Sequence, residues 1–239
     1  MLNTDVIHAS WKPLIMQALT QVNSDYLNDL SQHENWLPGK HAIFNAFQLP
    51  LSNTQAILFG ESPYPRPESA NGFAFWDANV KNLWSDTGLD KHVNRATSLR
   101  NMIKCMLLAE NYLNTTQLTQ EAIAKLDKSA LVQTAAQLFS NFARQGVLLL
   151  NASLVLSDRK VKDEAKQWVP FIRELLRQLG QQARPIKLIL MGKIAETILA
   201  LPESSAFPHI LMEHPYNLSF IHNPNALQLF GKWELLSQL

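Results

Sequence analysis

Residues 146–151 read GVLLLN, a short apolar run that ends on an asparagine. Three further runs share its length and character: QAILFG at 55–60, KLILMG at 187–192 and HILMEH at 209–214. Each is nearly continuous in apolar residues, as is typical of strands that are buried on both faces of a parallel sheet. The four runs therefore predict a central four-stranded, mostly parallel sheet.

Helical patterns separate these runs. Apolar residues recur at helical spacing in Ser98–Leu113, Ser129–Gln145 and Trp168–Gln182. Helices that alternate with strands predict an α/β fold, here a three-layer α/β/α sandwich. The first fifty residues are expected to be helical and then extended, and residues 76–97 to form a long irregular loop. No repeat or linker interrupts the chain, so residues 1–239 are expected to form a single domain.

The composition excludes several classes of protein. Of the 239 residues, 46% are hydrophobic, and the net charge of +1 excludes a strongly basic protein such as a histone. The single cysteine, Cys105, permits neither a disulfide framework nor a cysteine-based zinc site. The chain begins without a basic segment followed by an apolar core, and no apolar run is long enough to span a membrane. We therefore expect a soluble, cytoplasmic protein.

The ends of the predicted strands are the expected place for a ligand, because open α/β sheets bind ligands beyond the carboxyl ends of their strands. Those ends are Glu61–Tyr64, Asn151, Gly192 and His214. Three of the four offer polar or aromatic side chains.

The segment GESPY at 60–64 is close to the G-x-S-x-G nucleophile elbow of α/β-hydrolases. Three features argue against that reading of Ser62. Tyr64 is bulky where the elbow needs a small residue, and Pro63 has no N–H to offer an oxyanion. The further prolines nearby also prevent the helix that should follow. Ser62 is therefore not expected to be a hydrolase nucleophile.

Five segments, in the same order along the chain, resemble motifs of the family 1 uracil-DNA glycosylases. Residues 60–75, GESPYPRPESANGFAF, align without gaps with that family's water-activating loop, usually G-Q-D-P-Y-H followed by G-x-A-F. TSLRNM at 97–102 resembles its Pro-Pro-Ser-Leu loop, and GVLLLNASLVL at 146–156 resembles its G-V-L-L-L-N strand. LILMGKIAE at 188–196 resembles the strand before its last helix pair, and HPYNLSF at 214–220 resembles its H-P-S-P-L-S leucine loop. Five ordered motifs make the resemblance specific.

The resemblance implies a hydrolase of DNA base-excision repair. Such enzymes flip uracil out of DNA, because a base inside a duplex cannot be reached, and hydrolyse its N-glycosidic bond. The implied partner is single- or double-stranded DNA that contains uracil or a related damaged base. The resemblance also implies a monomer without a cofactor or a metal, and it leaves any protein partner unknown.

Three residues would contact the flipped base by resemblance. Phe75 would stack on it, Tyr64 would occupy the place of the thymine methyl group, and Asn151 would read the uracil edge with an amide that both donates and accepts. Each has a structural alternative: a core aromatic for Phe75, loop packing for Tyr64 and a strand-ending turn for Asn151.

Four further residues would act around the base. His214 would donate a hydrogen bond to the oxygen on which negative charge develops as the base departs. Leu218 would fill the gap in the base stack, and Ser98 and Ser219 would contact phosphates. The alternatives are a structural histidine and, for the serines, a helix cap or a turn.

The catalytic motif of the family is only partly present. Ser62 stands where the family has the aspartate that orients water, and a hydroxyl can hold a water but carries no charge. Glu61 replaces a glutamine, and the resulting segment GES at 60–62 resembles the G-E-A-P-G loop of the iron–sulfur uracil glycosylases. Cys105 alone cannot hold the four-cysteine cluster of those enzymes. Either Glu61 supplies the missing charge or Ser62 holds a water. Together with His214, these two are the candidate catalytic residues.

Other departures concern DNA binding. Pro65 replaces the motif's histidine, as in the poxvirus uracil glycosylase, and Tyr216 and Asn217 replace Ser-Pro in the leucine loop. The basic residues that usually follow that loop are gone, which predicts weaker phosphate binding. Residues 157–168 are expected to form a charged loop that either lies near DNA or is simply solvated; its cations are Arg159, Lys160, Lys162 and Lys166. A second hypothesis is therefore a catalytically silent relative that binds DNA, a nucleobase or a protein partner.

Overall fold

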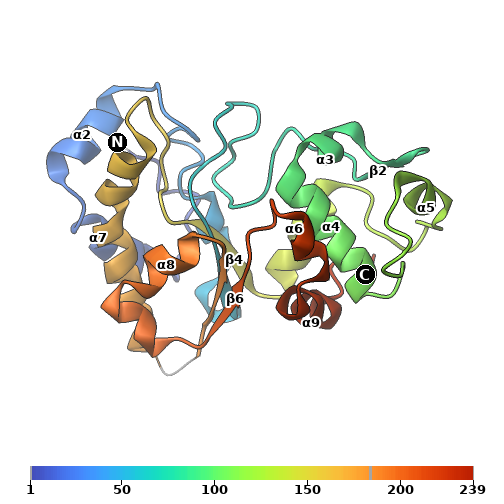
Figure 1. Cartoon of the computed structure of the whole chain (residues 1–239). Coiled ribbons are helices and arrows are strands. Elements are labelled where there is room, and N and C mark those ends of the chain that lie inside the picture. Colours follow the sequence, from blue (N-terminus) through green and yellow to red (C-terminus); the bar gives the residue numbers. More distant parts are fainter. Residues whose placement is uncertain (1, 183–184, 239) are drawn as a thin grey trace. The chain divides into compact units, whose positions relative to one another are not determined.

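The computed structural model describes residues 2–182 and 185–238, which divide into two compact units (Figure 1). The first unit comprises Met1–Ala74 and Gly146–Ile210, and the second comprises Phe75–Gln145 and Leu211–Leu239. The chain therefore passes between the units directly before Phe75, at Gly146 and again at Leu211. The expectation of a single domain over residues 1–239 stays a prediction.

A four-stranded sheet with flanking helices makes this an α/β fold, as predicted. The strands are β1 (Ala56–Gly60), β4 (Val147–Asn151), β5 (Lys187–Met191) and β6 (His209–Met212), in the order β4-β1-β5-β6. β1 pairs in parallel with both β4 and β5, and Gly60 lies opposite Asn151. Every residue of β1 and β4 is buried, which confirms the prediction from the continuous apolar runs.

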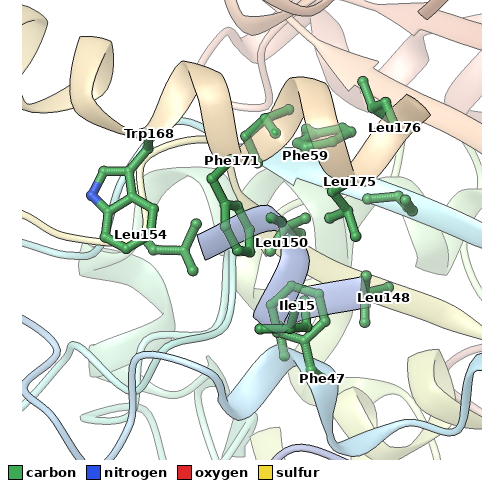
Figure 2. Close-up of a cluster of buried hydrophobic side chains, with 14 of the residues drawn as sticks. Ile15, Phe47, Phe59, Leu148, Leu150, Leu154, Trp168, Phe171, Leu175 and Leu176 are labelled. Carbon is green, nitrogen blue, oxygen red and sulfur yellow. The ribbon is translucent and has the colours of Figure 1, made fainter. Parts of the chain in front are cut away.

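Helices of the first unit cover one face of this sheet through an apolar core. The unit contains α1 (Lys12–Leu19), α2 (Ser24–Gln32), α7 (Val161–Gly180) and α8 (Ile194–Leu199), with the 3-10 turns η1 (Asn45–Gln48), η2 (Leu51–Asn53) and η3 (Pro202–Ala206). Figure 2 shows Ile15 of α1 and Phe171 of α7 in one cluster with Phe59 of β1 and with Leu148 and Leu150 of β4. These side chains are almost completely buried, so α1 and α7 shield this face from water.

The second unit is mainly helical. Its elements are the hairpin of β2 (Trp84–Ser85) and β3 (Gly88–Leu89), the helices α3 (Lys91–Arg95), α4 (Thr97–Ala109), α5 (Gln120–Lys125), α6 (Ala135–Arg144) and α9 (Pro224–Trp233), and the 3-10 turn η4 (Leu218–His222). α4 packs against both α9 and η4. Across residues 2–182 and 185–238, no helix has the length and apolar character needed to cross a membrane.

Two predicted helices begin elsewhere, for local reasons. α6 starts at Ala135 rather than Ser129, because Thr134 and Gln137 form a capping box there. α7 starts at Val161, so most of the expected charged loop at 157–168 is helical.

Two predicted irregular or extended segments were also wrong. Residues 76–97 contain the β2–β3 hairpin and α3, whose first turn is capped by the side chain of Asp90. The chain after α2 forms 3-10 turns at 45–53 rather than an extended segment.

Candidate functional site

The loop after β1, residues 61–74, is fastened to β4 and its extension at both ends; we call it the proline loop. At its start, the amide of Ser153 donates to the carbonyl of Glu61 (2.9 Å). At its end, the amide of Ala74 donates to the carbonyl of Leu149 (3.1 Å). The end of the loop is therefore held by the strand that carries Asn151, and its start by the residues that directly follow that strand.

Glu61 and Ser62 differ in their exposure. The side chain of Glu61 is exposed, whereas Ser62 is half-buried and the following Pro63 is buried. No helix follows Ser62, which confirms the argument against a nucleophile elbow. Ser62 is thus the more enclosed of the two candidates for the role of the missing aspartate.

Asn151 ends β4 with its side chain almost fully buried, at 4% exposure. It lies opposite Gly60, where an added Cβ would meet the Oδ1 of Asn151 and lie 2.8 Å from the Cβ of Ala74. The absence of a side chain at Gly60 therefore leaves the space that the Asn151 amide occupies. Such a fixed amide can both donate to and accept from a planar ligand edge.

Tyr64 is half-buried in the proline loop, one residue after the buried Pro63. Four predicted site residues thus belong to the first unit, three on the proline loop and one at the end of β4: Glu61, Ser62, Tyr64 and Asn151.

Phe75 opens the second unit with a left-handed backbone, at a φ of 62°. This conformation is costly for a bulky aromatic residue and is found most often where function requires a fixed side chain. The ring centroid of Phe75 lies 6.2 Å from that of His214, with the ring planes inclined by 40°. Two predicted site residues therefore lie beside each other although they are far apart in the sequence.

A backbone hydrogen bond at Nδ1 bears on the orientation of the His214 ring. The amide of Tyr216 donates to Nδ1 of His214 (3.0 Å). A nitrogen that accepts carries no proton, so the hydrogen of the neutral ring lies on Nε2. His214 is thereby arranged to donate a hydrogen bond through Nε2.

Asn101 of α4 holds the loop at residues 214–219, which we call the leucine loop. Its Nδ2 donates to three successive carbonyls, those of Pro215 (2.8 Å), Tyr216 (3.3 Å) and Asn217 (3.3 Å). Asn101 is fully buried, so these bonds form away from water. Sequence reasoning missed this residue, although a polar side chain on the apolar face of a helix was a signal that it had partners to find.

The tip of the leucine loop exposes Leu218 and ties down Ser219. Leu218 is 69% exposed, and its insertion between bases stays a prediction. The hydroxyl of Ser219 donates to the carboxylate of Glu213, which also accepts from the side-chain Nδ2 of Asn217 (3.4 Å). A negative charge that sequence reasoning overlooked therefore lies beside one of the two predicted phosphate contacts.

Ser98, the other predicted phosphate contact, is the second residue of α4 and is half-buried. No side chain caps this helix, because Ala96 occupies the N-cap position. The free amides and the dipole of a helix N-terminus attract anions. Ser98 therefore lies where a phosphate group is favoured.

Arg159 is engaged inside the first unit. Its guanidinium pairs with Asp29 (2.8 Å) and lies 5.5 Å from the centroid of the Tyr26 ring. Tyr26 and Ser157 both donate to the buried carboxylate of Glu164. Burial and this carboxylate raise the pKa of Tyr26. This network holds the chain that follows β4. Arg159, which was predicted to lie near DNA or in a solvated loop, therefore has a structural role.

Within the described ranges, no three His, Cys, Asp or Glu side chains gather into a group that could hold a metal ion. The site residues are instead amide, aromatic, hydroxyl and imidazole groups, together with one exposed carboxylate, Glu61. Within the first unit, the amide of Asn151 and the hydroxyl of Ser62 are groups that can donate and accept hydrogen bonds, and within the second unit the ring of Phe75 lies beside that of His214. The expected absence of a cofactor stays a prediction.

Comparisons with known proteins point to one family. The uracil DNA glycosylase superfamily matches residues 47–233. The uracil-DNA glycosylase of Lactococcus lactis subsp. cremoris (strain MG1363) is 30% identical over 200 residues, which cover 82% of this chain and 76% of that protein. The uracil-DNA glycosylase of Streptococcus mutans serotype c is 27% identical over 219 residues, covering 89% of this chain and 85% of the relative.

Solved structures agree with these matches. The crystal structure of wild-type UNG from Nitratifractor salsuginis is similar with a TM-score of 0.94 and 40% identity, covering 98% of this chain and 94% of that one. The crystal structure of mimivirus uracil-DNA glycosylase has a TM-score of 0.57 at 14% identity and covers 88% and 70% of the two chains. The mimivirus likeness concerns the fold alone.

Proposed function

Because the chain belongs to the uracil DNA glycosylase superfamily, we propose that it is a DNA-repair glycosylase that hydrolyses the N-glycosidic bond of uracil, or of a related damaged base, flipped out of DNA. The observation that carries this proposal is the ring of His214, which offers an N–H at Nε2 and lies beside Phe75. Negative charge develops on the base as the bond breaks. A donor that is already oriented stabilises that charge without the cost of reorganisation.

Three residues are proposed to bind the flipped base. The ring of Phe75 stacks on it, and its unusual backbone conformation supports a role that needs a fixed orientation. Asn151 accepts from the ring N–H of uracil and donates to a neighbouring carbonyl, which cytosine cannot match. Tyr64 excludes the methyl group of thymine.

Ser62 is proposed to hold the attacking water, since it is the more enclosed of the two candidates. The exposed carboxylate of Glu61 adds negative charge that stabilises the sugar cation. A carboxylate surrounded by water acts through a high dielectric, so it stabilises the cation less than an enclosed aspartate does. We therefore propose that base release is slower than in relatives that retain the aspartate.

DNA is proposed to bind through Ser98, Leu218 and Ser219. Ser98 and the N-terminus of α4 contact one phosphate, and Leu218 fills the space that the base leaves. Ser219 reaches a phosphate only when its hydroxyl releases Glu213.

We further propose a monomer in the cytoplasm that uses no cofactor, acts on single- or double-stranded DNA and works as one domain. The family match across residues 47–233, which includes parts of both units, supports the last point.

A second candidate function is a catalytically silent relative that binds DNA, a nucleobase or a protein partner. The serine at position 62 favours it, because no charged group occupies the position of the family's aspartate. The two functions differ in one measurable property, the release of a base.

Base release is tested with purified protein and oligonucleotides, single-stranded and duplex, that carry uracil, hydroxymethyluracil, hypoxanthine or xanthine. Alkali then cleaves the strand at each abasic site. We expect strand breaks with at least the uracil substrate, and their loss in the Asn151→Ala and His214→Ala variants. If all four bases stay attached, the protein is not a glycosylase and the silent function stands.

The Ser62→Asp variant tests the proposed division of labour between Ser62 and Glu61. A carboxylate restored at the enclosed position should raise the rate of uracil release, whereas Glu61→Gln should lower the wild-type rate by a smaller factor. An unchanged rate in Ser62→Asp would show that the missing aspartate is not what limits the reaction.

A further inference from the structure

The tip of the leucine loop carries two strongly exposed apolar side chains instead of one. Tyr216 is 67% exposed and Leu218 is 69% exposed. The other large exposed hydrophobic side chains of the described residues are less so, with Met16 next at 52%. Loss of water contact usually stabilises such side chains, so two of them presented together on one loop indicate a partner that covers both.

The backbone of Tyr216 is held from both sides. Its amide donates to Nδ1 of His214 (3.0 Å), and its carbonyl accepts from Nδ2 of Asn101 (3.3 Å). The amide of Asn217 donates to the carbonyl of His214 (2.9 Å), which closes the turn. Tyr216 is therefore exposed on a braced support, and the loop contributes little ordering cost when a ligand covers the ring.

On this basis we propose that Tyr216 stacks on a nucleobase next to the position vacated by the flipped base, and so acts as a second DNA-binding contact beside Leu218. The inference rests on the proposed function and extends it. Leu218 replaces the volume of a missing base, which matters only where a stack exists. The flat ring of Tyr216 offers a face to any base, paired or unpaired.

The size of the exposed tip favours DNA over a protein partner. A stable protein interface needs about 20–30 residues on each side, whereas a wedge of one or two side chains is enough to enter a base step. The exposed residues around the two side chains are the polar Asn217 and Ser219, which suit the edges of a groove rather than an apolar protein surface.

Binding to DNA that carries a stable abasic-site analogue tests the proposal without requiring catalysis. Dissociation constants are measured for single-stranded and duplex oligonucleotides with Tyr216→Ala, Tyr216→Phe and Leu218→Ala. Met16 is an exposed hydrophobic residue on α1, so Met16→Ala serves as the control for the loss of an exposed apolar side chain. We expect Tyr216→Ala to weaken binding about tenfold on both DNA forms, Tyr216→Phe to bind as the wild type does, and Leu218→Ala to weaken duplex binding more than single-strand binding.

Two results would overturn the inference: unchanged binding in Tyr216→Ala, or equal losses in Tyr216→Phe and Tyr216→Ala, because the latter would assign the contact to the hydroxyl rather than the ring. The proposed function can fail separately. A wild-type protein that binds the analogue with the expected dependence on Tyr216, yet releases no base, would refute the glycosylase and leave the stacking contact intact.

Discussion

Asn101 gives the sharpest link between buried structure and the proposed chemistry, and Asn101→Asp breaks that link with almost no change in shape. The amide nitrogen of Asn101 donates to the carbonyls of Pro215, Tyr216 and Asn217. An aspartate replaces this donor with an oxygen that repels them. The support under His214 and Tyr216 is then lost.

The size of the effect follows from the number of donors. The amide has two N–H groups, and each hydrogen bond is worth about 1 kcal/mol net. Because the buried carboxylate also repels the carbonyls, Asn101→Asp should cost at least about 2 kcal/mol of stability. In a chain of this size that loss lowers the melting temperature by about 4–8 °C. Base release should fall further, by about ten- to a hundredfold, because a misplacement of about 1 Å at a catalytic group costs that much.

Asn141→Asp is the matched control. Asn141 is also buried in the second unit, and its Nδ2 donates to the carbonyls of Leu235 (2.7 Å) and Ser237 (2.9 Å). The side-chain oxygens of both asparagines accept from a neighbouring arginine, so the local charge change is similar. Melting is followed by circular dichroism, and base release is measured at 25 °C, where all variants should be folded. Equal activity in the two variants at equal stability would refute the role assigned to Asn101.

Two further predictions concern a close contact and a titrating group. Gly60→Ala should displace the side chain of Asn151 and the backbone at Ala74. We expect the free energy of unfolding, measured by urea denaturation, to fall by about 1–3 kcal/mol, and base binding to be lost. Full binding of free uracil by the folded variant would contradict this prediction. Glu110 lies near the end of α4 and accepts from the amide of Leu236, and burial raises its pKa from 4.5 to about 7. A raised carboxyl pKa means that the folded protein holds the proton more tightly than the unfolded chain does. Its contribution to stability is therefore complete below pH 4.5 and is lost as the pH rises through 7, by at most about 3 kcal/mol. Glu110→Gln should remove this part of the pH dependence, and parallel stability curves for the two proteins between pH 4.5 and pH 8 would disprove the assignment.

The strands could be predicted from the sequence because a continuous apolar run leaves a chain few ways to bury itself. All four strands lie within the predicted runs. Helix starts were less predictable, because α6 begins at a cap formed by Thr134 and α7 begins in charged residues without apolar periodicity. The start of α6 depends on the side-chain hydrogen bonds of its capping box, whereas no side-chain hydrogen bond caps α7, and neither start shows in a repeating apolar pattern.

The candidate site was also only partly predictable from the sequence. Asn151 and His214 were recognisable because each ends a predicted strand within a motif. The supporting contacts were not, since Asn101 finds its carbonyls 114–116 residues further along the chain and Arg159 finds Asp29 130 residues back. The roles of Glu61 and Ser62 were left open by the sequence, because neighbouring residues in a turn can point to either side. Their different exposures come from the packing of the loop.

The two ends of the proline loop are bonded to β4 and to the residues directly after it, and this attachment affects which substitutions the loop can accept during evolution. Asn151 is the last residue of β4, and the bond between Ser153 and Glu61 holds the start of the loop, next to Ser62, to the segment that follows this strand. Both hydrogen bonds use backbone atoms, so substitutions in the middle of the loop can change its side chains without removing either bond. The Ser62→Asp substitution proposed above would therefore place a carboxylate on a loop whose two ends are already held by backbone hydrogen bonds.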